Sequence, residues 1–258
     1  LIFFETISLT SSFKTKPKEK IMIRKIDKNN MGKSDLGWLK SIFHFSFAEY
    51  HNPKNINFGV LRVINDDLIA ENTGFPLHPH KDMEIITYVV NGEVTHTDSI
   101  GNESVIRRGE VQYMSAGTGI YHSEANNSST EVLRALQIWI LPDFRNHVPN
   151  YGEYRFEWSD RKNKFLHMVS SKSGAAPIKI NQDINIYTIF LEKGLSEEFQ
   201  VTNGRQAYYV QIEGEADVNG EKLCQSDALE SISENLKIDA KIDSHIMIFE
   251  MAEREDLK

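Results

Sequence analysis

The chain has 258 residues, and its 29 Lys and Arg against 37 Asp and Glu give a formal net charge of −8. This length corresponds to one large domain or two smaller ones, and a hydrophobic content of 40% excludes disorder over the whole length. The acidic balance disfavours direct nucleic-acid binding, and the single cysteine, Cys224, excludes a disulfide framework within the chain and a cysteine-ligated metal centre.

The segment before the first methionine is interpreted separately. Residues 1–21 precede Met22, and we expect them to be a non-native or disordered leader outside the fold. The apolar run Leu1–Phe4 is too short for a secretory signal, and no later run approaches the ~18 apolar residues of a membrane-spanning helix. We therefore expect a cytoplasmic protein that does not associate with a membrane.

The first element-like segment after the leader is rich in aromatic residues. Phe43, Phe45 and Phe47 alternate along the chain and are followed by Tyr50, which predicts a strand with one buried face. We interpret these rings as core packing and not as substrate contacts.

Short runs rich in β-branched and aromatic residues follow from Phe58 onward and are separated by turn signals. This spacing predicts an all-β sandwich or barrel. Asn91-Gly92 lies between a run that ends at Val90 and the alternating run Glu93–Ser99, where it predicts a type I′ hairpin of antiparallel strands. Gly101-Asn102 marks the next turn.

A second block of strand-like runs extends from about Ile184 to Met251, so two β-domains of similar size are predicted. YVVNGEV at 88–94 and YVQIEGEA at 209–216 resemble each other, which indicates domain duplication. The small, polar stretch before Ile178 is the predicted linker. The expected boundaries are 1–21 for the leader, 22–169 for the N-terminal domain, 170–177 for the linker and 178–258 for the C-terminal domain with its charged tail.

Two short motifs carry potential metal ligands, His78-Pro79-His80 and His122-Ser123-Glu124. In an extended chain, residues i and i+2 project from the same face, so each segment can direct two side chains at one point. Two such strands that face each other inside a barrel would form a four-ligand metal site. Gly117-Thr118-Gly119 precedes the second motif and suits a bend that directs His122 inward.

The segment that contains both motifs resembles a known family. Residues 74–124, GFPLHPHKDMEIITYVVNGEVTHTDSIGNESVIRRGEVQYMSAGTGIYHSE, are similar to the metal-binding half of the pirin family of bicupins, especially bacterial members described as quercetin 2,3-dioxygenases. HPHKDMEI and SAGTGIYHSE are long and specific, and weaker similarity extends from about Met22 to Met251. The resemblance implies two tandem cupin (jelly-roll) β-barrels with one metal ion in the N-terminal barrel.

The resemblance also implies which residues hold the metal ion. Glu84 is a rival for the fourth ligand, because many cupins follow their His-x-His motif with a glutamate on the same strand. Glu124 is preferred from the family pattern together with its spacing from His122. Glu84 and His96 are then candidates for residues that contact the ligands but do not bind the metal ion. The implied ligands are His78, His80, His122 and Glu124.

The C-terminal barrel is predicted to be metal-free. The positions that correspond to the first histidine pair hold Gln200 and Thr202, and the region that corresponds to the second pair offers only Asp239. We expect this barrel to have a structural role, in which it closes or shapes the first barrel.

Three histidines and one carboxylate suit Fe(II), Mn(II), Co(II), Ni(II), Cu(II) or Zn(II), and we favour Fe(II). Two positions of a six-coordinate ion would stay open for a chelating substrate, or for one substrate oxygen and O2. Together with the resemblance, this predicts a dioxygenase that cleaves quercetin or a related chelating aromatic substrate with O2. Glu124 is the candidate catalytic base, as in the flavonol-cleaving cupins that this chain resembles, and Glu84 is the alternative if Glu124 stays bound to the metal ion. The alternative is a metal- or redox-responsive transcriptional co-regulator without turnover, which binds a protein partner and not nucleic acid.

Overall fold

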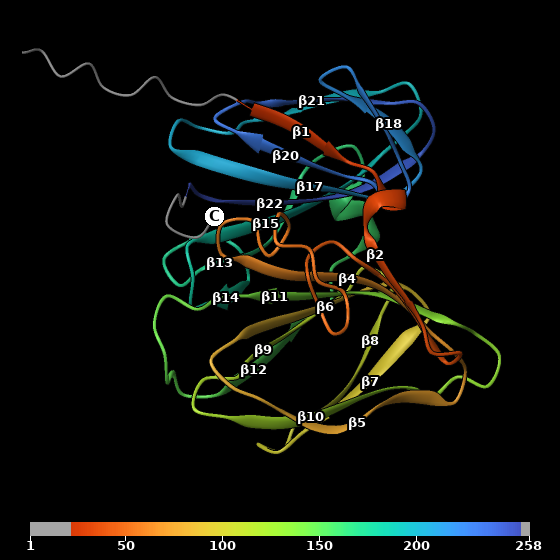
Figure 1. Cartoon of the computed structure of the whole chain (residues 1–258), viewed down its shortest axis with the longest axis vertical. Helices are drawn as coiled ribbons and strands as arrows, with labels where there is room; N and C mark the ends of the chain where they lie inside the picture. Colours follow the sequence, from red (N-terminus) through yellow and green to blue (C-terminus); the bar gives the residue numbers. More distant parts are fainter. Residues whose placement is uncertain (1–21, 254–258) are drawn as a thin grey trace, which may run out of the picture.

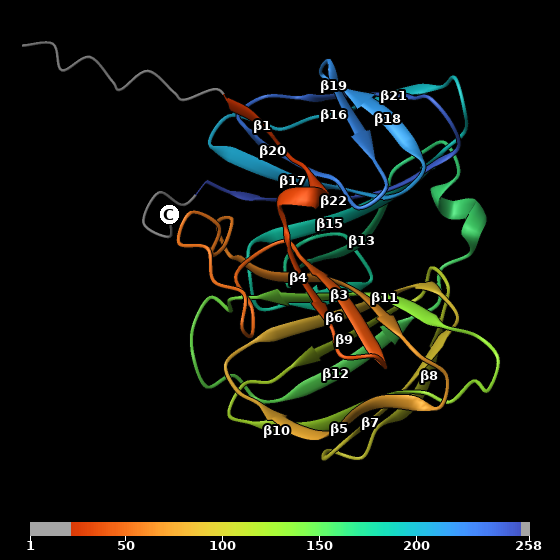
Figure 2. The same ribbon diagram turned by 45° about the vertical axis from the view of Figure 1, so that its right-hand side comes forward.

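The computed structural model describes residues 22–253, so the predicted leader 1–21 and the last residues of the charged tail lie outside the described residues. The described chain is almost entirely β-structure and forms two stacked barrels (Figures 1 and 2), which confirms the all-β prediction of tandem barrels. Two short 3-10 helices occur in this range, η1 (Lys28–Asn30) and η2 (Trp158–Arg161). No helix of residues 22–253 is long and apolar enough to cross a membrane.

The first barrel combines a seven-stranded and a four-stranded sheet. In spatial order the larger sheet contains β12 (Asn150–Tyr154), β9 (Val111–Ser115), β6 (Glu84–Asn91), β11 (Leu133–Ile140), β4 (Leu61–Ile69), β3 (Leu39–Phe43) and β2 (Gly32–Asp35). The smaller sheet contains β5 (Thr73–His80), β10 (Ile120–Asn126), β7 (Glu93–Asp98) and β8 (Glu103–Arg107).

The second barrel repeats this arrangement. Its seven-stranded sheet contains β1 (Met22–Ile26), β20 (Ala228–Ile232), β17 (Arg205–Glu213), β22 (Ser244–Ala252), β15 (Ile184–Leu191), β13 (Leu166–Ser171) and β14 (Ile178–Ile180). Its four-stranded sheet contains β16 (Ser196–Phe199), β21 (Leu236–Ala240), β18 (Glu215–Val218) and β19 (Glu221–Cys224).

Strand pairing crosses the domain boundaries that the sequence suggests. The first described strand, β1, pairs antiparallel with β20 and so extends the sheet of the second barrel. β13 runs through residue 170, which lies in the expected linker, and pairs with β15. Residues 22–26 and 166–171 therefore belong to the second barrel, and the expected limits of 22–169 and 170–177 do not match the sheets. Strands β1 and β13 satisfy backbone groups at positions in that sheet that would otherwise be unpaired.

The turn at Asn91-Gly92 does not form the predicted hairpin. β6 pairs with β9 and β11, whereas β7 pairs with β8 and β10 in the other sheet. Gly92 has a φ of 78°, and a Cβ there would lie 3.2 Å from Cα of Leu133, so glycine lets the chain pass tightly between the sheets. Gly214 (φ 86°) joins β17 and β18 at the equivalent corner, which explains the sequence repeat. The turn at Gly101-Asn102 joins paired strands, as predicted.

The barrels pack together through their larger sheets (Figure 1). One apolar cluster spans the contact and includes Tyr88 of β6, Ile138 of β11, Tyr208 of β17 and Phe249 of β22. Side chains from both barrels therefore share one core, and each barrel covers an apolar face of the other.

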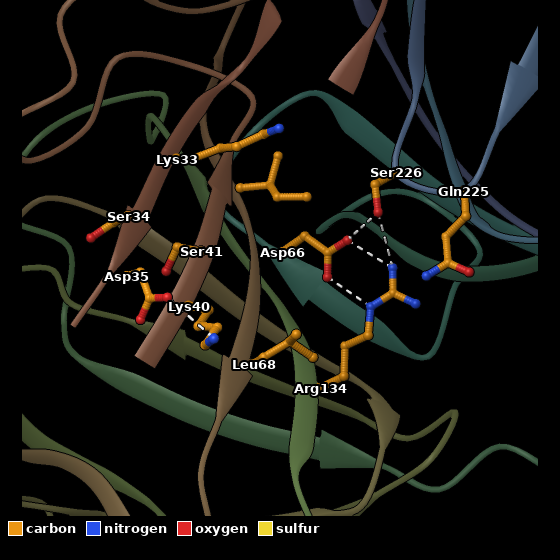
Figure 3. A pocket seen from close by; sticks show the side chains of 11 residues that line it. Lys33, Ser34, Asp35, Lys40, Ser41, Asp66, Leu68, Arg134, Gln225 and Ser226 are labelled. Carbon is orange, nitrogen blue, oxygen red and sulfur yellow. Dashed lines mark hydrogen bonds and ion pairs between the residues drawn. The ribbon is translucent and has the colours of Figure 1, made fainter. Parts of the chain in front are cut away.

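An ion pair at the edge of this contact connects the barrels (Figure 3). Arg134 of β11 donates to both carboxylate oxygens of Asp66 of β4, at 2.8 and 2.7 Å, and Ser226 of the second barrel donates to Asp66 at 2.8 Å. Arg134 also donates to the carbonyl oxygen of Ile212, at 2.9 Å. Burial opposes ionisation, but these donors hold the pKa of Asp66 below its usual range. The pair therefore stays charged at neutral pH.

Candidate metal centre

β5 and β10 bring three of the expected ligands together. The strands pair antiparallel with His78 directly opposite His122, and His80 follows two residues further along β5. The centroids of the three imidazole rings lie 4.4 to 4.9 Å apart, and one nitrogen of each ring lies within 4.8 Å of the others. The i, i+2 spacing of His78 and His80 therefore places both rings beside His122, whereas Glu124 is not part of this three-histidine group.

The hydrogen bonds of these histidines leave ring nitrogens available for a cation. Nδ1 of His78 lies 2.7 Å from the carbonyl oxygen of Pro76, and because a carbonyl only accepts, this contact selects the neutral tautomer with the proton on Nδ1 and the lone pair on Nε2. Nε2 of His122 is buried without a hydrogen-bond partner among the described residues. An orphaned nitrogen beside two other imidazoles fits a divalent metal ion, which would satisfy it.

Burial keeps two of these imidazoles neutral. It lowers the pKa of His122 to about 2 and that of His80 to about 4, and neighbouring histidines add to both effects. Neutral imidazole is the form that donates a lone pair to a metal ion. At neutral pH these two rings therefore need not lose a proton before they bind a cation.

His96 of β7 lies behind His122. The two Nδ1 atoms are 3.4 Å apart, Gln112 Nε2 lies 3.1 Å from Nδ1 of His96, and Asp98 Oδ2 lies 3.3 Å from its Nε2. Burial lowers the pKa of His96 although Asp98 opposes this. A hydrogen bond from Nδ1–H of His122 to His96 would fix the ring of His122 and direct its Nε2 into the site.

Glu124 is held from the opposite sheet. Thr87 of β6 donates through Oγ1 to Oε1 of Glu124 at 2.7 Å, and Gln137 of β11 donates through Nε2 to the other oxygen. Burial raises the pKa of Glu124 to about 7, against the effect of these two hydrogen bonds. Glu124 forms a group of potential ligands with His96 and His122, so this group and the three-histidine group share His122.

Glu84, the rival ligand, has a different set of partners. It accepts hydrogen bonds from Ser115 Oγ at 2.6 Å and from the backbone N–H and side-chain amide of Asn181, each at 3.1 Å. Asn181 follows β14 of the second barrel, so Glu84 links the two barrels. Glu84 belongs to neither group of potential ligands in the described chain.

A cavity of about 310 Å³ opens beside the three histidines. Aromatic rings form one continuous wall: the Trp139 ring lies 4.9 Å from that of His80 and 5.4 Å from that of Phe47, centroid to centroid. Phe43 continues the wall, 5.5 Å from Phe47. A wall of this kind suits a planar aromatic ligand. The cavity also has polar lining residues, namely Ser34, Ser41, Asn65, Asp67, Glu124 and Gln137.

The aromatic segment divides between the core and this cavity. Phe45 packs against Tyr208 of the second barrel, at 5.2 Å between centroids, as the core interpretation expects. Phe43 and Phe47 line the cavity instead. That interpretation is therefore incomplete, because β3 ends at Phe43 and the alternating rings do not lie on one strand face.

The sequence motifs do not identify the polar residues that complete the site. Thr87, Gln137 and Asn65 occupy inward positions of β6, β11 and β4, and each is flanked at i−2 by an apolar inward residue. A polar residue in the interior register of a buried strand is the signal that could have identified them.

Comparison with known proteins identifies clear relatives of this chain. The family described as Pirin matches residues 25–140, and the quercetinase C-terminal cupin domain family matches residues 167–251. A protein of Escherichia coli K12 named quercetin 2,3-dioxygenase is 42% identical over 224 residues, which are 86% of this chain and 96% of that protein. A pirin-like protein of Caulobacter vibrioides is 44% identical over 196 residues, which are 76% and 84% of the two chains.

Solved structures agree with the fold described above. The crystal structure of the bacterial pirin YhhW from Escherichia coli in complex with nickel(II) is 40% identical and has a TM-score of 0.85. The alignment covers 90% of this chain and 100% of that chain. The prediction of two tandem cupin barrels is thereby confirmed, and the histidine cluster together with this relative supports a divalent metal ion in the N-terminal barrel.

Proposed function

Because the chain belongs to the pirin family, we propose that it is a metal-dependent dioxygenase that acts on quercetin or a related chelating aromatic substrate with O2. The observation that supports this proposal best is the aromatic-walled cavity beside the histidine cluster. The proposed metal is Fe(II), and the proposed role of His96 is to orient His122. The proposed ligands are His78, His80, His122 and Glu124.

A divalent metal ion held by these residues would supply Lewis acidity toward a chelating substrate and O2. The chain itself orients the substrate, because the rings of Trp139, Phe47 and Phe43 line the cavity at 51° to 85° to one another and can contact an aromatic molecule through both faces and edges.

Glu124 is the proposed base that accepts the proton of the substrate hydroxyl. Thr87 and Gln137 fix its carboxylate, and each oxygen that accepts one hydrogen bond retains a further lone pair. Without a metal ion, burial raises the pKa of Glu124 to about 7; because a carboxylate bound to a metal ion is a weaker base, the role requires Glu124 to loosen from the ion before it accepts the proton. Glu124 can therefore combine orientation with proton transfer.

The test measures oxygen uptake with quercetin by protein reconstituted anaerobically with Fe(II). Glu124→Gln and Glu84→Gln are measured beside the wild type at matched metal content, and metal-free wild-type protein reports background autoxidation. We expect Glu124→Gln to lose activity by about 100- to 10,000-fold. Folded Glu84→Gln should retain most of it, because Glu84 does not line the cavity.

Two results would contradict this assignment. Wild-type uptake no higher than that of metal-free protein would overturn the dioxygenase and favour a metal-responsive interaction protein. Activity that is lost in Glu84→Gln but kept in Glu124→Gln would move the role of the base to Glu84.

A further inference from the structure

We propose that the cavity holds a second recognition site, formed by Asn65, Asp67 and Ser41, which binds a hydroxyl group on the far ring of an aromatic substrate anchored at the metal. This inference rests on the proposed function and specifies its substrate class. The preferred ligand is a chelating aromatic compound with at least one additional ring hydroxyl.

The inward-facing side chains of the larger sheet form a polar row next to the candidate ligands. Backbone pairing places Gln112 opposite Thr87, Thr87 opposite Gln137, and Gln137 opposite Asn65. Gln112 contacts His96, and both Thr87 and Gln137 donate to Glu124. Asn65 ends the series, one strand beyond the residues that contact the candidate ligands.

Asn65 and Gln112 each have a buried, unpaired amide oxygen, but Gln112 contacts His96 through its Nε2, whereas the Asn65 side chain has no such contact among residues 22–253. The Asn65 side chain is only 4% exposed, lines the cavity and makes no hydrogen bond to any described residue, and its Oδ1 is buried. Buried amides are normally paired, because an unpaired one costs free energy that a partner would recover. A polar ligand in the cavity would supply that partner.

Asp67 and Ser41 extend this polar surface. Asp67 projects from the same face of β4 as Asn65, two residues along, and Ser41 of β3 lies opposite it and donates to its carboxyl group. All three residues line the cavity. An amide and a carboxyl group side by side can both accept from and donate to a hydroxyl group, which itself has both capacities.

The aromatic wall connects the two ends of the cavity. It begins at Trp139 beside His80 and ends at Phe43, which lies opposite Asn65 on the neighbouring strand. Neighbouring strands are about 4.8 Å apart, so Asn65 lies about 5 Å beyond Gln137, a step on the scale of one aromatic ring. A planar ligand that chelates the metal and packs on this wall would therefore extend its far ring toward Asn65.

The test compares 3-hydroxyflavone, which has only the chelating hydroxyl and carbonyl groups, with 3,7-dihydroxyflavone and 3,4′-dihydroxyflavone. Each of the latter adds one hydroxyl group that cannot chelate. Dissociation constants are measured without oxygen on Ni(II)-loaded protein, so the result does not depend on turnover. We expect the wild type to bind at least one dihydroxyflavone about tenfold more tightly than 3-hydroxyflavone.

Asn65→Leu should reduce this ratio to below about twofold and leave the affinity for 3-hydroxyflavone unchanged. Ser34→Ala is the matched control, because Ser34 is a half-buried polar residue that also lines the cavity, and it should keep the ratio. The metal-free Asn65→Leu protein should unfold at the same temperature as the wild type or higher, since leucine replaces an unpaired amide of similar volume.

Three outcomes overturn the recognition site: equal affinity of the wild type for all three flavones, no binding of any of them, or a ratio that persists in Asn65→Leu. A lower unfolding temperature together with a persistent ratio would assign Asn65 a structural role only. Failure of the dioxygenase proposal is distinguishable. In that case oxygen uptake is absent while the ratio that depends on Asn65 remains.

Discussion

Asp66 and Asp67 are consecutive residues of β4 that face opposite sides of one sheet. Asp66 binds Arg134 and Ser226 at the contact between the barrels, whereas Asp67 accepts a hydrogen bond from Ser41 inside the cavity. Strand alternation thus gives two adjacent carboxyl groups different roles, one in holding the barrels together and one in lining the proposed substrate site.

Arg134→Met should strongly destabilise the protein. The substitution keeps much of the side-chain volume but leaves the carboxylate of Asp66 buried without its charged partner. We expect a loss of about 3–5 kcal/mol in the free energy of unfolding, measured by urea denaturation. The double variant Asp66→Leu/Arg134→Met should recover part of this loss. A double variant less stable than Arg134→Met would contradict the explanation.

The exposed ion pair between Lys40 and Asp35 provides the control for this experiment. Its atoms are 3.2 Å apart, but both side chains are about 60% exposed. Lys40→Met should therefore change stability little, because water solvates and screens both charges. A comparable loss in both variants would show that burial is not the cause.

Asp67→Asn should change the pH dependence of stability in the metal-free protein. Burial raises the pKa of Asp67 from 3.8 to about 7. Because the folded state binds this proton more tightly than the unfolded state, the stabilisation is full below about 3.8 and is lost as the pH rises through about 7. The variant should therefore gain stability relative to the wild type as the pH rises from about 4 to about 7.

Thermal unfolding of both proteins across this pH range measures the effect. The depressed pKa values of His80 and His122 act in the opposite direction, with stability rising as pH increases, but they are common to both proteins and cancel in the difference. A difference that stays constant with pH would show that Asp67 is ionised in the folded protein throughout.

His122→Ala should abolish most metal binding. His122 belongs to both groups of potential ligands, and its buried Nε2 has no other partner in residues 22–253. We expect the affinity for Ni(II), measured by calorimetric titration, to fall by more than about 100-fold. His167→Ala is the control, because His167 binds Asn185 in the second barrel. Wild-type affinity in both His78→Ala and His122→Ala would refute the assigned site.

Gly92→Ala should destabilise the protein more than Gly101→Ala. Both glycines have a positive φ, 78° and 98°, so alanine is strained at either position. Only at Gly92 would the added Cβ crowd backbone atoms, those of Leu133, whereas at Gly101 it meets open space. We expect a loss above about 1 kcal/mol for Gly92→Ala in urea denaturation and a smaller loss for Gly101→Ala. Equal losses would mean that strain in φ alone explains both.

The features that the sequence alone predicted are local ones. Strand-like runs and turn residues were enough for an all-β fold in two similar halves, because both signals act within a few residues. The spacing of His78 from His80 and of His122 from Glu124 likewise gives each pair one common face. The resemblance of residues 74–124 to the pirins then supplied the metal and the function that these pairs imply.

Only the tertiary structure decided which distant strands meet. In the structure, the Asn91-Gly92 segment connects two different sheets, and β1 belongs to the second barrel. Thr87 and Gln137 donate hydrogen bonds to Glu124. Thr87 and Glu124 are 37 residues apart, and nothing in either segment specifies the register that joins them. Periodicity shows which face of a strand is buried, but the packing of the whole barrel sets which buried faces share one cavity.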